Sequence, residues 1–501
     1  MNPIKSLRAS LRMLWYEPRI VLTLYLFASG LGTVARVPIL ITLGLIGWIL
    51  STRETFDSLA ETVTQTQASV ESSSMPNGEV VGLLRDAVET AVTPTILGIT
   101  GVGVATAVGL FILFSALSSA VTIGGIHSLL RQQRPIEDSL HTLATHWRAL
   151  LIVKLSFYLG VTLFVAVGLL IAANISGSVD QASPIAVAVA VSVGGVVSGV
   201  LILTWILVFA FAEQAVVIDK RTGLDAVSQS VKLPFQRPMI IVGYVGVALG
   251  AVVVAGVLAA IAALGGAIRI LTLGTAIVLP AIVDGFKTSI YAERNFRSTY
   301  TLTLRRRFVE TGRDGAQTLL RFVRSHPLAN IASASVFALG SLIGWSITAG
   351  IDTELPAETN IGSVFGSLPI GTFVNLSINN WLVAADLGLG GVIAGVPTIT
   401  NLIFNGVVVG AVGGATTFAA FVALVAPHGI IELPAIAIGG GLGLWLGAVG
   451  VQALRGYYSI SETANAIKYA FRVLLGLIPL FVIAGFIEAF LTPSIANVLI
   501  S

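Results

Sequence analysis

The sequence predicts an all-α, polytopic integral membrane protein with about 11 transmembrane helices in two modules. Of its 501 residues, 55% are hydrophobic and only 11% are charged, which is more apolar than a soluble domain needs. The apolar residues also fall in repeated windows of about 20 residues with almost no charge, the length of a helix that spans a bilayer. The 53 glycines fit this class, because small residues let membrane helices approach closely.

Composition also excludes some chemistry. The chain has no cysteine, so it can have no disulfide, thiolate nucleophile or thiolate metal site. The formal net charge is only +3, so the positions of the charges matter more than their sum. We expect the lipid bilayer and protein partners around this chain, and no nucleic acid.

Residues 1–300 are predicted to form a six-span module. The first span, 21–50, is interrupted by Arg36-Val37-Pro38. Pro38 disfavours helical geometry at Val37, so we expect either one long span or a broken one, with Arg36 paired or reaching the interface. The remaining spans are expected at 96–124, 149–173, 184–212, 238–264 and 268–290. Residues 51–93 and the loop near Asp180 are expected outside, and the segments 131–148 and 213–237 are expected to form amphipathic inner connections.

Residues 301–326 are predicted to form a basic cytoplasmic linker. Its arginines are Arg305, Arg306, Arg307, Arg313, Arg321 and Arg324. The positive-inside rule places such a stretch in the cytoplasm, and anionic lipid beside it is a better expectation than nucleic acid. The linker resembles residues 5–19 before the first span, which suggests a fusion of two membrane modules. We expect the cell (plasma) membrane, with the N-terminus cytoplasmic and the C-terminus outside.

Residues 327–501 are predicted to form a five-span module in which some helices are broken. The spans are expected at 328–349, 371–395, 400–425, 430–452 and 473–491, with an acidic outer loop at 352–358. Glycine and proline make regular helix hard to continue at two places. These helix-breaking residues are Gly388, Gly390, Gly391, Gly395 and Pro397 at the first place, and Pro427, Gly429 and Pro434 at the second.

The last four spans also hold polar side chains. An ionisable group at bilayer depth is expensive unless it is paired or faces water, so its presence indicates a candidate functional site. His428 and Glu432 are four residues apart and would share one face and a hydrogen bond if the segment is helical. Asp386 and Glu488 are expected nearer the interface. The predicted intramembrane polar cluster consists of Asn379, Asn380, Asn405, His428, Glu432 and Glu488.

Three functions for this cluster remain open. His428 and Glu432 can form an internal clip that fixes a broken helix, which is the interpretation we favour. Half-helices that meet around polar groups are also the pattern of transporter and proton-relay sites. His428, Glu432 and Glu488 can supply three ligands to a catalytic metal, but no HExxH-type pairing supports this, so we expect no metal and no cofactor. The asparagines are expected to hold helices together.

The same residues carry a resemblance to a known family. The segments are Asn379-Asn380, Asn405-Gly406, PHGIIELPA at 427–435 and IEAFLTP at 487–493. In order, spacing and residue type they resemble the signature of the stage II sporulation protein M (SpoIIM-like) family. In spore formers this family is an integral membrane scaffold that recruits peptidoglycan-degrading partners. One departure is Leu444-Trp445, where many members carry a basic residue.

The N-terminal half resembles a six-span prokaryotic membrane domain of unassigned function, which is also attached to some glycerophosphodiester phosphodiesterases. The catalytic carboxylates and histidines of that phosphodiesterase barrel are missing from this sequence, so we do not expect that activity. The family resemblance of the second half and the large basic inner surface lead us to expect a non-enzymatic scaffold in envelope or membrane remodelling. A transporter or channel for a small solute, built on the intramembrane polar cluster, is the alternative.

Overall fold

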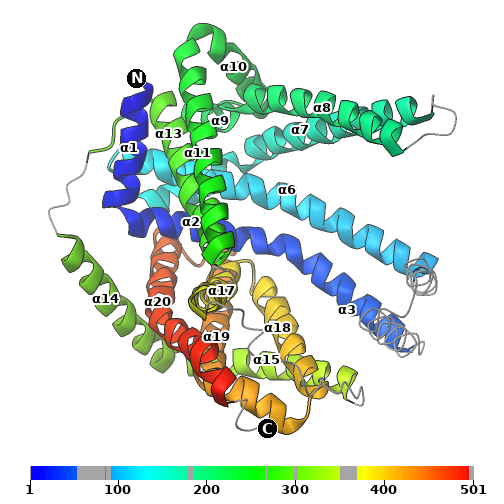
Figure 1. The fold of residues 1–501 in the computed structure, drawn as a ribbon. Helices are drawn as coiled ribbons and strands as arrows, with labels where there is room; N and C mark the ends of the chain where they lie inside the picture. Colours follow the sequence, from blue (N-terminus) through cyan, green and yellow to red (C-terminus); the bar gives the residue numbers. More distant parts are fainter. Residues whose placement is uncertain are drawn as a thin grey trace.

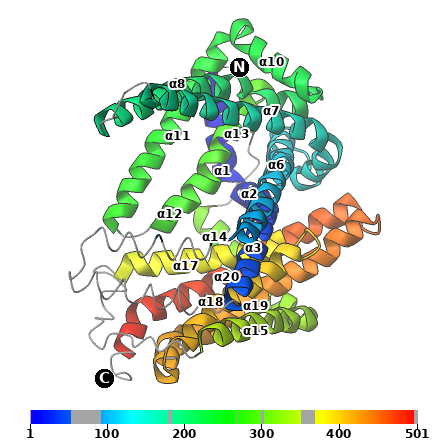
Figure 2. The ribbon, with the colours of Figure 1, turned by 90° about the vertical axis from the view of Figure 1, so that its right-hand side faces the viewer.

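The computed structural model describes residues 2–52, 85, 92–177, 184–265, 268–297, 303–349 and 369–495. Every regular element within these ranges is a helix, as predicted. The predicted outer loops at 51–93, near Asp180 and at 352–358 lie wholly or mostly outside the described residues. Figures 1 and 2 show the helices of residues 327–495 below most of those of the first half, and Figure 1 shows α2 and α3 running between the two groups.

The helices of the first half are α1 (Pro3–Tyr16), α2 (Pro18–Gly32), the 3-10 turn η1 (Thr33–Arg36), α3 (Val37–Thr52), α6 (Pro94–Leu130), α7 (Pro135–Gly177), α8 (Pro184–Phe209), α9 (Ala212–Asp219), α10 (Gly223–Gln236), α11 (Pro238–Gly265), α12 (Ile268–Leu273), the π-turn η2 (Gly274–Val278) and α13 (Leu279–Tyr291). Those of the second half are α14 (Leu304–Ser325), α15 (Pro327–Thr348), α17 (Pro369–Gly390), α18 (Val396–Gly414), α19 (Phe418–Leu454), α20 (Ile460–Phe486) and the π-turn η3 (Ile487–Leu491).

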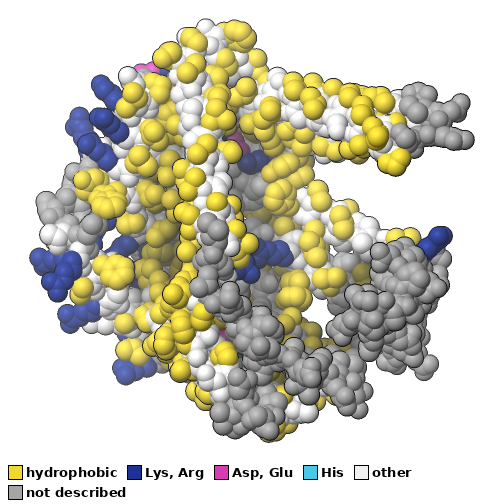
Figure 3. All heavy atoms as spheres, viewed as in Figure 1, with side chains coloured by type: hydrophobic (Ala, Val, Ile, Leu, Met, Phe, Trp, Pro, Cys, Tyr) yellow, Lys and Arg dark blue, Asp and Glu magenta, His cyan; other side chains and the backbone are white. Residues whose placement is uncertain are grey.

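Within the described ranges, 10 helices are long and apolar enough to cross a membrane. They correspond to all the predicted spans except 371–395, which is α17, a helix of 22 residues that carries three asparagines and Asp386. Large apolar side chains such as Leu203 and Val252 lie exposed along the spans, and Figure 3 shows them covering much of the visible face. A bilayer provides the apolar surroundings for such side chains, so the chain is a multi-pass membrane protein.

Three amphipathic helices each turn through a single residue into an apolar helix that begins with proline. The turning residues are Glu17 between α1 and α2, Arg237 between α10 and α11, and His326 between α14 and α15. Their backbone leaves helical geometry because the proline ring that follows disfavours it. Each N–H still donates to the carbonyl four residues earlier, at 2.8–2.9 Å. The two segments 5–19 and 305–324, which resemble each other in sequence, are therefore each followed by the same one-residue turn. α10 is followed by this turn as well.

The first span, for which the sequence left one long helix or a broken one open, is helical throughout but changes to 3-10 geometry just before Pro38. α2 ends at Gly32, the 3-10 turn η1 follows, and α3 begins at Val37. Arg36 is paired, because its Nη1 lies 3.0 Å from Oδ2 of Asp386 on α17. Asp386 therefore has a partner in the first half of the chain, which the sequence did not predict.

The glycine-rich break in the second half is confirmed. α17 ends at Gly390, and the turn that follows places Gly395 at a φ of 72°, where a residue with a side chain would be strained. The Thr398 hydroxyl donates to the carbonyl of Leu387 at 2.7 Å and ties the turn together. α18 begins directly after Gly395.

The second predicted break is wrong. Pro427, Gly429 and Pro434 lie inside α19, which continues from Phe418 to Leu454 without interruption. The helix boundary is instead at Gly414, and Thr417 caps α19 by accepting from the Ala420 N–H at 3.2 Å. The predicted boundary between the spans 400–425 and 430–452 is therefore misplaced.

The physical reason for this error is the membrane. A proline inside a helix removes one backbone hydrogen bond, whereas leaving the helix altogether would expose several backbone groups that lipid cannot satisfy. Continuing the helix is the smaller cost. His428 and Glu432 consequently lie well inside one long helix and not between two half-helices.

The two halves share a hydrophobic core. One cluster of buried residues includes Leu24 and Phe27 of α2 together with Leu387 of α17 and Leu474 of α20. α2 and α17 approach so closely that a Cβ added at Gly30 would overlap the backbone of Leu389. The division into modules at 1–300 and 327–501, joined by the linker 301–326, stays a prediction.

Candidate functional site

Three ionisable side chains of the second half meet inside the helix bundle. His428 and Glu432 come from α19, and Glu488 comes from the π-turn η3. One ligand-type atom from each side chain lies within 4.8 Å of the other two. His428 Nε2 lies 3.9 Å from Glu488 Oε1, and these two side chains are only 13% and 18% exposed. We call His428, Glu432 and Glu488 the second-half polar cluster.

Glu488 reaches the cluster because α20 changes its geometry. The regular helix stops at Phe486, and the next five residues form the π-turn. The backbone N–H of Thr492 closes this turn by donating to the Ile487 carbonyl, and the Thr492 hydroxyl donates to the same carbonyl at 3.3 Å. A π-turn inserts one residue and rotates the side chains that follow it, and such turns are frequent at functional sites. Glu488 was expected near the interface without a partner, and the structure instead places it against His428.

The predicted clip between His428 and Glu432 does not form. Both side chains are described, and no hydrogen bond joins them. His428 Nδ1 and one carboxylate oxygen each of Glu432 and Glu488 are buried without a hydrogen-bond partner. The spacing of four residues does place the two side chains on one face of α19, but packing against η3 directs His428 toward Glu488.

Asn379 and Asn380 join the cluster from α17. Asn379 Nδ2 donates to Asn380 Oδ1 at 3.0 Å, and the buried Asn380 side chain also interacts with the Glu432 carboxylate. The pair therefore connects α17 to a charged group of α19. Of the asparagines in the predicted cluster, these are the two that the structure brings to it.

Asn405 has a different role. Its Nδ2 donates to the carbonyl of Asn401 on its own helix at 2.8 Å. The adjacent Gly406 lies where α18 crosses α15, and a Cβ there would overlap the carbonyl of Phe337. This segment therefore serves close helix packing, as we expected of small residues.

A cavity of about 140 Å³ opens beside the cluster. His428 and Glu432 line it on one side, together with Gly429, and Val408 and Val412 of α18 line it on another. The wall is apolar apart from the imidazole and the carboxylate. Such a space can hold a cation with water molecules, or a small polar solute, next to groups that exchange protons.

The sequence analysis missed a second buried cluster, in the first half. Lys154 of α7 forms an ion pair with Glu213 of α9, and each side chain is 18% exposed. The Tyr25 hydroxyl donates to Asp284 Oδ2 at 2.8 Å, and Lys287 interacts electrostatically with both acids. We call these five residues the first-half charged cluster. A cavity of about 150 Å³ adjoins it.

A sequence signal for this cluster did exist. Lys154 and Asp284 lie inside the predicted spans 149–173 and 268–290, where any ionisable residue indicates a candidate site. The five residues of the cluster come from four helices. The tertiary structure was therefore needed to show that they lie together.

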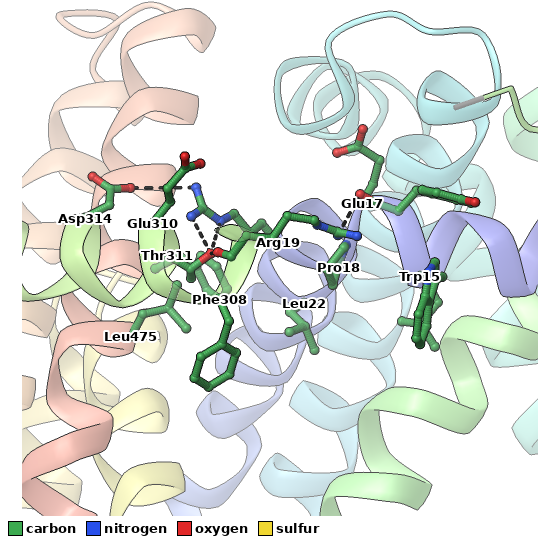
Figure 4. A pocket seen from close by; sticks show the side chains of 14 residues that line it. Trp15, Glu17, Pro18, Arg19, Leu22, Phe308, Glu310, Thr311, Asp314 and Leu475 are labelled. Carbon is green, nitrogen blue, oxygen red and sulfur yellow. Dashed lines mark hydrogen bonds and ion pairs between the residues drawn. The ribbon is translucent and has the colours of Figure 1, made fainter. Parts of the chain in front are cut away.

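A groove of about 690 Å³ lies where α1 turns into α2 beside α14. Figure 4 shows Arg19 directed across it, with Nε donating to the Thr311 hydroxyl at 2.9 Å and Nη1 lying 3.8 Å from Asp314 Oδ2. Partial burial raises the pKa of Glu17 at this turn, and the Arg307 guanidinium acts in the opposite direction. The groove therefore has a charged rim over an apolar floor.

Comparisons with known proteins agree with the motifs of the second half. The family model described as Stage II sporulation protein M matches residues 333–493, which include both asparagine segments and all of the second-half polar cluster. An uncharacterized protein of Methanocaldococcus jannaschii is 33% identical over 134 residues, which are 26% of this chain and 75% of that protein. No solved structure matches the chain.

Proposed function

The chain belongs to the stage II sporulation protein M family, and from this membership we propose that it is a non-enzymatic membrane scaffold that recruits protein partners in envelope or membrane remodelling. We place it in the cell membrane with the N-terminus in the cytoplasm and the C-terminus outside. The observation that carries the proposal is a basic surface on α1 and α14.

This basic surface consists of exposed residues on two helices: Lys5, Arg8 and Arg12 of α1, and Arg305, Arg306, Arg313, Arg321 and Arg324 of α14. Figure 3 shows Lys and Arg side chains gathered along the left-hand side, where Figure 1 places α1 and α14. Arg306 has an acidic partner in Glu310 at 2.9 Å. Arg313 and Arg324 have no ion-pair partner among the described residues. A positive surface of this kind favours an acidic partner.

Two aromatic side chains add to this surface. Trp15 is 57% exposed and Phe308 is 84% exposed, and both line the groove between the α1–α2 turn and α14. Aromatic and arginine side chains are the residue types enriched at protein interfaces. We therefore propose a partner segment with acidic and apolar residues.

The non-enzymatic part of the proposal rests on the composition of the site. Cysteine is absent from the chain. Within the described part of the chain, the ring of His428 faces a carboxylate and has no serine or threonine hydroxyl as its hydrogen-bond partner. An activated nucleophile needs such a neighbouring base.

The test is cross-linking in native membranes followed by identification of the proteins that co-purify. The intact chain is compared with the double variant Arg313→Glu, Arg324→Glu, whose side chains lie on one exposed face of α14. Lys232→Glu is the matched control, because it reverses an exposed charge on α10, which lies away from α14 in Figures 1 and 2.

We expect a specific partner whose yield falls at least tenfold in the α14 variant and is unchanged in the control. No stable partner in native membranes, or equal recovery from all three proteins, contradicts the scaffold proposal. If only co-purifying anionic lipid is lost, the basic surface lies on the bilayer and does not bind a partner.

A transporter or channel for a small solute is the second candidate. The observation that favours it is the meeting of His428, Glu432 and Glu488 beside a cavity inside the bundle, since intramembrane acids and histidines occur in ion and proton pathways. Flux of protons and metal cations into liposomes tests it. Flux that is unchanged by His428→Ala and Glu432→Gln counts decisively against this function.

A further inference from the structure

The second-half polar cluster has an unbalanced charge. Two carboxylates, Glu432 and Glu488, lie within 4.8 Å of one histidine. No lysine or arginine in the described ranges forms an ion pair with either carboxylate. Two acids this close in an apolar bundle need a positive charge or a shared proton.

The cluster also holds hydrogen-bonding atoms without partners. His428 Nδ1, Glu432 Oε2 and Glu488 Oε2 are buried, and none of them has a hydrogen-bond partner. Buried polar atoms are nearly always satisfied by protein, water or an ion. That all three residues of one cluster keep an unsatisfied atom indicates that the cluster can take a further ligand or water molecules.

We propose that His428, Glu432 and Glu488 bind one divalent first-row transition metal ion, such as Zn²⁺ or Mn²⁺. One imidazole nitrogen and two carboxylate oxygens suit this class of ion. Three protein ligands leave at least one position for water or another ligand. The binding goes beyond the scaffold function and does not depend on it.

The distances fit this assignment once the three side chains move closer together, because their ligand atoms lie within 4.8 Å of one another. Two ligand atoms bound tetrahedrally to Zn²⁺ at about 2.1 Å lie roughly 3.4 Å apart. His428 Nε2 and Glu488 Oε1 lie 3.9 Å apart, so side-chain rotations of a few tenths of an ångström bring them into range. The α-helical spacing of His428 and Glu432 puts two ligands on one face of α19, and the π-turn η3 supplies the third.

The surroundings fit as well. The cavity of about 140 Å³ adjoins His428 and Glu432 and has room for water ligands, each of which occupies about 30 Å³ in the liquid. Asn380 lies beside Glu432 and is itself held by Asn379 at 3.0 Å. Outer contacts of this kind orient a metal-binding carboxylate. Asn380 is therefore a positioning residue of the proposed site.

The experiment uses the untagged full chain, purified in nanodiscs and freed of metal with a chelator. Equilibrium dialysis with Zn²⁺ or Mn²⁺ and elemental analysis gives the number of ions bound. The visible absorption of Co²⁺ reports whether the ion is held by a defined set of ligands. The variants are Glu488→Gln and Asn380→Ala, and Glu310→Gln on the exposed face of α14 is the matched control. Circular dichroism and gel filtration verify that each variant is folded.

We expect one ion per chain at about micromolar free metal or below. Glu488→Gln should abolish this binding, Asn380→Ala should weaken it by about 10- to 100-fold, and the control should bind as the intact chain does. Absence of binding to the folded intact chain overturns the proposal. So does binding that Glu488→Gln leaves unchanged, because the ion would then lie elsewhere.

Discussion

Two buried clusters of ionisable groups lie in the two halves of this protein, and they differ in charge balance. In the first-half charged cluster, Lys154 and Lys287 face Glu213 and Asp284, and the Tyr25 hydroxyl adds a hydrogen bond. In the second-half polar cluster, Glu432 and Glu488 have no lysine or arginine partner within the described ranges, and the ionisable side chain beside them is His428. The first cluster contains its own counter-charges, and the second does not.

This difference shows how to separate structural from functional charges in a membrane protein. Both clusters are buried, so burial alone does not distinguish them. A balanced cluster stabilises the fold by pairing its charges, and breaking one pair leaves an uncompensated charge. An unbalanced cluster with unsatisfied atoms has capacity left for a proton, a cation or a partner group. The predictions below test this distinction.

The largest effect is expected for Lys154→Met. The substitution leaves Glu213 without its ion-pair partner in an apolar bundle, and we expect a loss of about 3–5 kcal/mol in the free energy of unfolding. Denaturation of the protein in mixed micelles measures it. The double variant Lys154→Met, Glu213→Leu should recover most of the loss. A single variant that unfolds like the intact chain would mean that the first cluster is not held by pairing.

A smaller effect is expected for Tyr25→Phe. The substitution keeps the ring but removes the hydroxyl that donates to Asp284 at 2.8 Å. A hydrogen bond to a charged group contributes about 1.5–3 kcal/mol, and the free energy of unfolding should fall by that amount. Tyr457→Phe, at an exposed tyrosine, is the control and should have no measurable effect. Equal values for the two variants would refute the role of Tyr25.

A matched pair of substitutions, Glu213→Gln and Glu432→Gln, tests the difference between the two clusters most directly. Both neutralise a buried carboxylate of the same shape. Without added metal, Glu432→Gln should change the free energy of unfolding by less than about 1 kcal/mol, because no cation loses its partner. Glu213→Gln should cost more, since it leaves Lys154 unpaired. Similar losses in both variants, measured by the same denaturation, would remove the distinction between the clusters.

The smallest effect is expected at the surface. Arg306 and Glu310 form an exposed ion pair one helical turn apart on α14. Such pairs contribute about 0.3–0.5 kcal/mol, so Arg306→Ala should lower the free energy of unfolding by no more than that, and less at high salt. Thermal unfolding at two salt concentrations measures it. A loss of several kcal/mol would show that α14 is held by this pair and not by its apolar face.

Local sequence features predicted local structure well. Arg36-Val37-Pro38 marked the place where the first span changes to 3-10 geometry, and the glycine series before Pro397 predicted the end of α17. Pro427 and Pro434 predicted a break that does not occur, because the bilayer favours a continuous helix over exposed backbone. Proline therefore had different outcomes at two places: a 3-10 turn precedes Pro38, whereas the helix continues through Pro427 and Pro434.

The membrane class, the family and most helices could be predicted from the residues alone, because these depend on the length of apolar runs and on nearby residues. The sequence also named His428, Glu432 and Glu488 as one candidate set. Three contacts could not be predicted in this way: His428 with Glu488, Arg36 with Asp386, and Lys154 with Glu213. Such contacts depend on how each helix is rotated against its neighbours, and that rotation follows from packing over the whole bundle.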